Sequence, residues 1–142
     1  MIRIRSKVWP LLLAAAVPLM ASADDARQLV ELPLPMQQHM LANMRDHLAT
    51  LDSVLAHLAA SEGDQAADIA ESRLGMSSLD SHGASHMAGF MPVEMQAIGT
   101  GMHKAASRFA RVAREGDALA AYAALQPVTA ACVACHAGYR IR

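Results

Sequence analysis

Apolar residues recur every three or four positions in two long stretches of the chain. This is the spacing of one face of a helix in a bundle. The first stripe begins near residue 36 and the second begins after Pro92. Their members are Met40, Met44, Leu48, Leu51, Leu55 and Leu58, and then Met95, Ile98, Met102, Ala105, Phe109 and Val112. The pattern predicts two long helices, the first ending near Gly63 and the second near Gly116.

Two further helices are predicted between and after these stripes. Residues 64–74 have a thin apolar face, and Asp64 is placed to cap its start. The last helix is expected from about Ala118 to Tyr139, with Asp117 as its cap. Pro127 falls inside it and predicts a kink, because proline removes a backbone hydrogen bond.

The glycine content of two segments suggests departures from regular helix. Gly99 and Gly101 lower the helix propensity of the second long helix, and we expect them to allow close approach of a neighbouring helix or of a bound group. Residues 75–91 are rich in Ser, Gly, His and Met and break the apolar pattern. This segment predicts an irregular crossover between the second and third main helices.

The composition favours an all-α fold. Ala, Leu, Met, Glu and Arg are frequent, and these residues favour helix. Four helical segments with short links predict an antiparallel up-down-up-down four-helix bundle with an irregular crossover. In that topology the N-terminal half of the first helix lies beside the C-terminal end of the last.

The N-terminus resembles an export signal. Three basic residues precede an apolar run over residues 8–20, and the small residues 21–23 match a cleavage site. An uncleaved membrane anchor is the alternative, but the run is short and is interrupted by two prolines. We therefore predict a signal peptide over residues 1–23, an N-terminal extension over residues 24–35, and a bundle over residues 36–142 without a membrane span.

Charge and motifs exclude several function classes. The formal net charge is −1, and outside the first residues no cluster of Lys and Arg suggests a nucleic-acid partner. The sequence lacks G-x-S-x-G, H-E-x-x-H and Gly-rich phosphate loops. We therefore expect a protein that is not a substrate-converting enzyme.

The residues with the most specific chemistry are Cys132, Cys135 and His136. They form a C-x-x-C-H run, the spacing used to attach a c-type haem. Two thiols three positions apart can each bond one vinyl group of the same porphyrin, and the histidine can then reach the iron. A disulfide or a redox-active C-x-x-C are the competing interpretations. A redox site would normally open a helix after a strand.

The C-terminal residues resemble the end of the cytochrome c′ family and of its low-spin, six-coordinate relatives. The resemblance rests on the C-x-x-C-H run, on Tyr139 and Arg140 after it, and on residues 125–128 (Leu-Gln-Pro-Val) before it. It implies a periplasmic four-helix bundle with one covalently bound haem c per chain. It also implies thioether links at Cys132 and Cys135, His136 as the proximal iron ligand, and Arg140 as a contact to a haem propionate.

In this family one residue of the first helix decides the sixth ligand, about four turns before that helix ends. Counting back from Ala60 gives Met44. A methionine there implies a low-spin electron carrier, whereas a non-ligating apolar residue implies a five-coordinate binder of nitric oxide or carbon monoxide. Met44 also fits a purely packing role, and Met40, one turn away, is the fallback ligand.

The histidines suggest a further interpretation. His82 and His86 are four residues apart, a spacing that suits a metal on one helical face. With Met87 and Met91 nearby, a copper-handling site is conceivable, because imidazole and thioether suit copper. We expect His47 near the haem but off the apolar seam, and we expect His103 to be partly exposed.

The sequence therefore predicts an exported mono-haem c-type cytochrome. Its expected role is to carry electrons to and from redox partner proteins in the periplasm, with His136 and Met44 as axial ligands. Gas binding by a five-coordinate iron is the alternative, and a copper-handling haem protein is the third interpretation. Assembly as a homodimer is left open.

Overall fold

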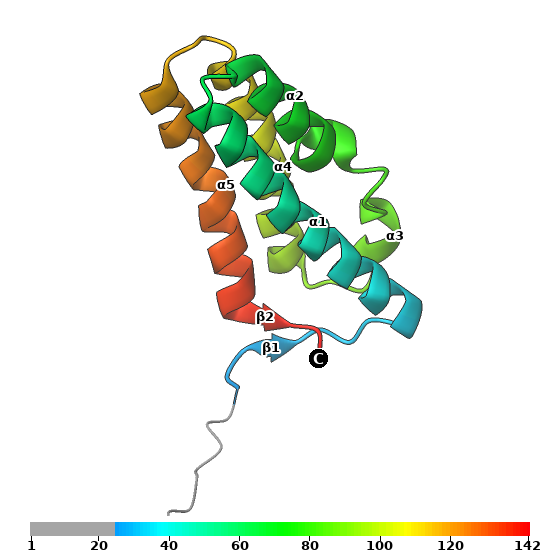
Figure 1. Cartoon of the computed structure of the whole chain (residues 1–142). Coiled ribbons are helices and arrows are strands. Elements are labelled where there is room, and N and C mark those ends of the chain that lie inside the picture. The colour runs from blue at the N-terminus through cyan, green and yellow to red at the C-terminus, as the bar shows by residue number, and fades with distance from the viewer. Residues whose placement is uncertain (1–24) are drawn as a thin grey trace, which may run out of the picture.

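A computed structural model describes residues 25–142 and shows a helical bundle (Figure 1). The predicted signal peptide over residues 1–23 lies outside the described residues. The main helices are α1 (Leu34–Ala59), α2 (Gly63–Leu74), α4 (Val93–Ala113) and α5 (Ala118–Gly138). A short 3-10 helix, η1 (Met76–Ser78), and the helix α3 (Ala84–Ala88) form the crossover. The all-α bundle with an irregular crossover is thus confirmed.

Helix ends follow local sequence signals. The Asp117 side chain accepts hydrogen bonds from the backbone N–H groups of Leu119 and Ala120, so it caps α5 as predicted. Asp64, by contrast, lies in the first turn of α2 and makes no capping bond. There its charge still complements the positive end of the helix. Helix α5 continues through Pro127 as one helix.

The closest helix pairs are α4 with α5, α1 with α2, and α2 with α4. Helices α1 and α5 are not among the closely packed pairs. We call the main core the alanine-rich core. Its largest fully buried side chains are Phe109, Leu74, Val54 and Val128. Its small members come from α2, α4 and α5: Ala66, Ala67, Ala70, Ala106, Ala110, Ala113 and Ala121. Because alanine has almost no side chain, these helices can approach closely.

Helix α1 buries a different face from the predicted one. Its buried residues are Met40, Asn43, His47, Thr50, Val54 and Leu58. The predicted seam is wrong in its middle, since Leu48 is 70% exposed and Leu55 is 45% exposed. The polar residues are tolerated because they are paired: Asn43 Nδ2 donates to the His82 carbonyl at 3.0 Å, and Thr50 Oγ1 donates to the Asp46 carbonyl at 2.8 Å.

The prediction for the glycines of α4 is wrong as far as neighbouring helices are concerned. At Gly99 and Gly101, apart from the nearby backbone of α4 itself, no atom of the described residues lies within 4 Å of where a Cβ would be. Close approach occurs instead at Gly63, the first residue of α2. A Cβ there would overlap the Ala113 carbonyl oxygen at the end of α4.

Near the lower end of α5 in Figure 1, an N-terminal segment crosses the C-terminal tail. Strand β1 (Gln28–Leu29) pairs in parallel with β2 (Tyr139–Arg140). The next residue, Val30, donates its N–H to the Arg140 carbonyl at 2.8 Å, and its side chain is buried. We call residues 25–32 the N-terminal strap. The sequence pattern did not predict this pairing, because two-residue strands have no periodicity to detect.

One described helix, α5, is long and apolar enough to cross a membrane by length and composition. This is weak evidence, because a core helix of a soluble protein passes the same test. Helix α5 packs closely along α4. Its apolar residues surround the whole helix rather than forming one stripe.

Candidate functional site

The two cysteines lie in the last two turns of α5, with half-buried side chains and free thiols. Cys132 packs against the alanine-rich core. Cys135 packs against a second apolar cluster at the end of the bundle near the N-terminal strap. The C-x-x-C run therefore lies where two clusters meet, and each thiol faces a different one.

The second cluster is rich in methionine, and we call it the Met-rich cluster. It draws residues from the N-terminal strap, α1, the crossover, α4 and the C-terminal tail. Its buried members are Val30, Met40, Met87 and Met95, and its partly buried members are Leu32, Met44, Met91, Cys135, Tyr139 and Ile141. The bundle topology predicted that the N-terminal half of α1 lies near Cys135, and the structure places Met40 and Met44 there. Which methionine binds iron stays a prediction.

The surroundings of the thiols argue against a redox-active dithiol. Burial raises the pKa of the Cys132 thiol, and burial together with the neighbouring Cys132 raises the pKa of Cys135. Reactive C-x-x-C sites have lowered pKa values and lie at helix N-termini. Here the pair lies near a helix C-terminus, where the helix dipole also disfavours a thiolate.

His136 follows Cys135 in the last turn of α5, and its side chain is exposed. Its backbone carbonyl accepts a hydrogen bond from Arg27 of the N-terminal strap, at 3.5 Å from Nη1. The strap therefore contacts the motif itself. An exposed imidazole one residue after Cys135 is free to bind a metal centre held by the two thiols.

Arg140 has an unused hydrogen-bond donor. Its Nε is the one buried side-chain nitrogen or oxygen without a hydrogen-bond partner in residues 25–142. The nearest carboxylate, Asp25, lies 3.6 Å from it, outside hydrogen-bond range. Hydrogen bonds from Arg27 lower the pKa of Asp25 to about 2 and direct that carboxylate to Arg27. A buried guanidinium donor without a partner suits a carboxylate ligand.

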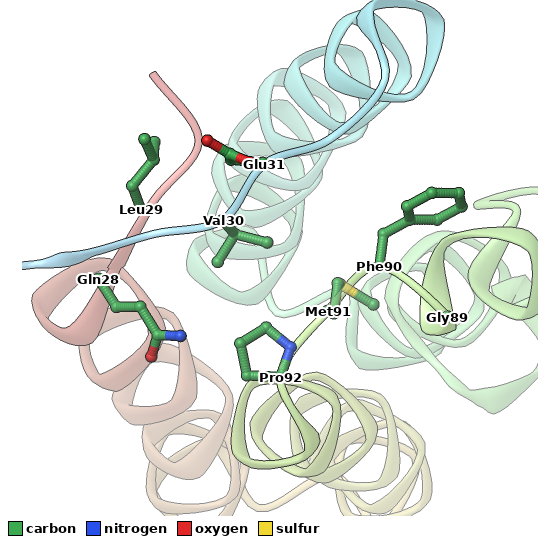
Figure 2. A pocket seen from close by; sticks show the side chains of 8 residues that line it. All are labelled: Gln28, Leu29, Val30, Glu31, Gly89, Phe90, Met91 and Pro92. Carbon is green, nitrogen blue, oxygen red and sulfur yellow. The ribbon is translucent and has the colours of Figure 1, made fainter.

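A hollow of about 470 Å³ lies beside the Met-rich cluster, between the N-terminal strap and the turn before α4 (Figure 2). Figure 2 shows Val30 pointing from the strap toward the turn that contains Met91. Both residues belong to the Met-rich cluster. A second hollow of about 320 Å³ lies between the start of α1 and the crossover. Apolar thioethers, two free thiols, an imidazole and a guanidinium Nε without a hydrogen-bond partner together fit a haem with its propionates.

The copper interpretation does not match the structure. His82 is buried and His86 is exposed, and Gly83 between them adopts a left-handed conformation with φ 63°. The two histidines therefore do not share one helical face. Within the part of the chain that the structure describes, no three His, Cys, Asp or Glu side chains are placed to hold a metal ion.

Two other histidines are more buried than the sequence suggested. The prediction that His103 is partly exposed is wrong, because its Nδ1 donates to the Leu74 carbonyl at 2.7 Å and its ring is buried. His47 lies off the predicted seam, but it is on the face of α1 that is actually buried. A histidine between apolar positions gives no sequence signal of which carbonyl it will meet, so this burial was not predictable.

Comparison with known proteins gives one result. A family model described as Cytochrome C' matches residues 90–140, which cover the turn before α4, helices α4 and α5, and the C-x-x-C-H run. The match does not include α1, so it does not distinguish the branches of the family that differ at the sixth ligand. Searches of curated proteins and of solved structures gave no match.

Proposed function

We propose that this chain, which a cytochrome c′ family model matches over residues 90–140, is an exported electron carrier with one covalent haem c. We propose that it works in the periplasm and exchanges electrons with redox partner proteins. Bound haem would supply a one-electron Fe(III)/Fe(II) couple. The chain's own part is to hold, orient and shield that group.

The observation that supports this proposal most is the position of Met44. It belongs to the same apolar cluster as Cys135, although the two residues are 91 positions apart by subtraction of their numbers. A group attached at Cys132 and Cys135 would thus lie within reach of a thioether from α1. A thioether ligand on iron stabilises the reduced form and raises the reduction potential.

Each site residue has a distinct role in the proposal. Cys132 and Cys135 would form the thioether links, and His136 would bind the iron. Arg140 would donate from its Nε to a propionate. The Met-rich cluster excludes water, which reduces the reorganisation that accompanies electron transfer.

Met44 is preferred over Met40 because of burial. Met40 is a buried member of the Met-rich cluster, whereas Met44 is partly exposed at its edge. A side chain at the edge can turn toward a bound group without leaving a cavity. Methionine is suited to this, because it is unbranched and flexible.

The test is the absorption spectrum of the reduced holoprotein with and without carbon monoxide. We expect a low-spin spectrum that carbon monoxide leaves unchanged. Met44→Ala should become high-spin and bind carbon monoxide, whereas the matched variant Met40→Ala should keep the wild-type spectrum.

Two outcomes would contradict the assignment. Rapid carbon monoxide binding by the wild-type protein would show an open iron and favour a five-coordinate gas binder. A wild-type spectrum in Met44→Ala, with loss of the low-spin state in Met40→Ala, would transfer the ligand role to Met40. In either case the covalent haem would remain.

A further inference from the structure

Three buried histidines meet on the side of the bundle where the crossover packs. His47 comes from α1, His82 from the crossover and His103 from α4, and all three are buried. Their ring centroids are 4.7, 5.4 and 6.1 Å apart. We call them the histidine cluster. Haem attachment gives this cluster no role.

The hydrogen bonds of the cluster require His47 to be neutral, because its Nε2 must accept. The Leu74 carbonyl can only accept, so His103 Nδ1 carries a hydrogen. Ser78 Oγ donates to the Gly75 carbonyl and therefore accepts from His82 Nδ1, 3.4 Å away. The same His82 Nδ1–H faces His47 Nε2 at 3.5 Å, so His47 Nε2 must be the acceptor. These tautomers follow from the bonding network.

A proton added to His47 Nε2 would point at the hydrogen on His82 Nδ1. The contact between α1 and the crossover would then become repulsive. The same crossover residue is also attached to α1 through its backbone, since the His82 carbonyl accepts from His39 Nε2 at 2.9 Å and from Asn43 Nδ2 at 3.0 Å. Loss of the ring contact would leave these two bonds as the hydrogen bonds from α1 to the crossover, while Gln96 Nε2 on α4 donates to the Ala88 and Met91 carbonyls, both at 2.9 Å.

The charges facing the cluster make proton uptake harder. His103, His39 on α1 and Arg73 on α2 act on His82, and both His82 and His103 act on His47. The carboxylate of Asp46 on α1 is paired with Arg73. Glu71 on α2 accepts hydrogen bonds from Ser77 at the start of the crossover.

We propose that the histidine cluster is an acid-sensitive contact that holds the crossover, residues 75–91, against α1 and α4. When the cluster takes up a proton, the contact breaks and the crossover opens. Opening moves Met87 and Met91, which belong to the Met-rich cluster. Acid therefore uncovers the face of that cluster that the crossover covers.

The direction of the pH effect follows from burial. Burial, and then the neighbouring His82 and His103, lower the pKa of His47 to about 4, and burial lowers that of His82. An opened crossover restores values near the ordinary 6.5 of histidine. The open form thus binds more protons, and the closed form loses stability as pH falls from about 6.5 toward about 4.

Hydrogen exchange of the crossover amides in the holoprotein tests this proposal. After correction for intrinsic exchange, uptake of one proton on opening predicts exchange about 30-fold faster at about pH 5 than at about pH 7.5. The double variant His47→Gln, His82→Gln should lose this dependence, because glutamine keeps polar contacts but does not titrate. The control His86→Gln, at an exposed site on α3, should keep it.

An NMR titration of the imidazole resonances in the wild-type protein tests the proposal even if the double variant does not fold. We expect the His47 and His82 rings to take up protons together with crossover opening. Titration near pH 6.5 while the crossover amides stay protected would overturn the proposal. The link to the haem rests on the proposed function, but the exchange data do not. A failed Met44 assignment would leave the exchange prediction in place.

Discussion

The two apolar clusters of the molecule are built from different side chains. The alanine-rich core consists of small residues around Phe109, Leu74 and Val54, and it joins α1, α2, α4 and α5. The Met-rich cluster joins the N-terminal strap, α1, the crossover and the tail after α5 through long thioether side chains. Alanine brings helices close and fills space rigidly, whereas methionine adapts to irregular space and can ligate a metal.

We therefore expect the alanine-rich core to determine the stability of the bundle and the Met-rich cluster to determine the properties of the haem. The alanine-rich core holds the helices that position Cys132, while the Met-rich cluster lines the side that Cys135 faces. Variants in the first should unfold the protein without changing its haem spectrum. Variants in the second should change haem properties at a smaller cost in stability.

The largest expected loss of stability is for Phe109→Ala. Phe109 is fully buried at the centre of the alanine-rich core. Removal of a buried aromatic ring costs about 3–5 kcal/mol of unfolding free energy. Urea unfolding measures this loss, and the spectrum of the still-folded fraction should match wild type. A changed spectrum with unchanged stability would reverse the division between the clusters.

A smaller effect is expected for Gly63→Ala. The added Cβ would overlap the Ala113 carbonyl oxygen, so α2 and the end of α4 must move apart. Overpacking of this kind costs about 1–3 kcal/mol.

Gly116→Ala is not a suitable control, because Gly116 has φ 79°. Gly101→Ala is suitable, since α4 is helical there and the position is open; it should be neutral or stabilising. Equal urea midpoints for both variants would disprove the close contact at Gly63.

Asp117→Ala should lower the unfolding free energy by about 1 kcal/mol. It removes the side-chain acceptor for two N–H groups at the start of α5. Asp117→Asn keeps an acceptor and should restore most of the loss in the same urea experiment. The haem spectrum should not change, because the cap lies at the opposite end of α5 from the cysteines. Full loss in Asp117→Asn would mean that charge, not hydrogen bonding, matters there.

The smallest stability effect is expected for Arg140→Gln, below about 1 kcal/mol, since its buried Nε has no hydrogen-bond partner to lose. Its effect should be on the haem instead. Removal of a cation beside a propionate favours oxidised iron, so the reduction potential should fall. Arg142→Gln, at the exposed last residue, is the matched control in potentiometric titration. Equal potentials in the two variants would remove Arg140 from the haem site.

Most of the architecture was predictable because helix periodicity and helix ends are local signals. The predicted last helix, from about Ala118 to Tyr139, differs by one residue at its end from the observed α5. The C-x-x-C-H run was equally local. Its placement beside Met40 and Met44 followed from an antiparallel bundle with short links.

The errors arose where polar groups are paired. Asn43 and His47 meet the distant residue His82, and Thr50 bonds the Asp46 carbonyl of its own helix, so these residues occupy the buried face of α1, while Leu48 and Leu55 do not. A pattern of hydrophobicity favours burial of the leucines, because it carries no information about hydrogen-bond partners elsewhere in the chain. Here Asn43 bonds the His82 carbonyl and His47 contacts the His82 ring. The burial of His103 and the N-terminal strap depend in the same way on contacts across the chain.

The ligand on the second side of the iron is the central claim, and proton NMR of the reduced holoprotein tests it most directly. A methionine bound to diamagnetic haem iron has its methyl resonance shifted far upfield by the porphyrin ring current. We expect one such resonance, absent in Met44→Leu and present in Met40→Leu. No upfield methyl in the wild-type protein, or one that survives in Met44→Leu, would contradict the claim that Met44 completes the haem site.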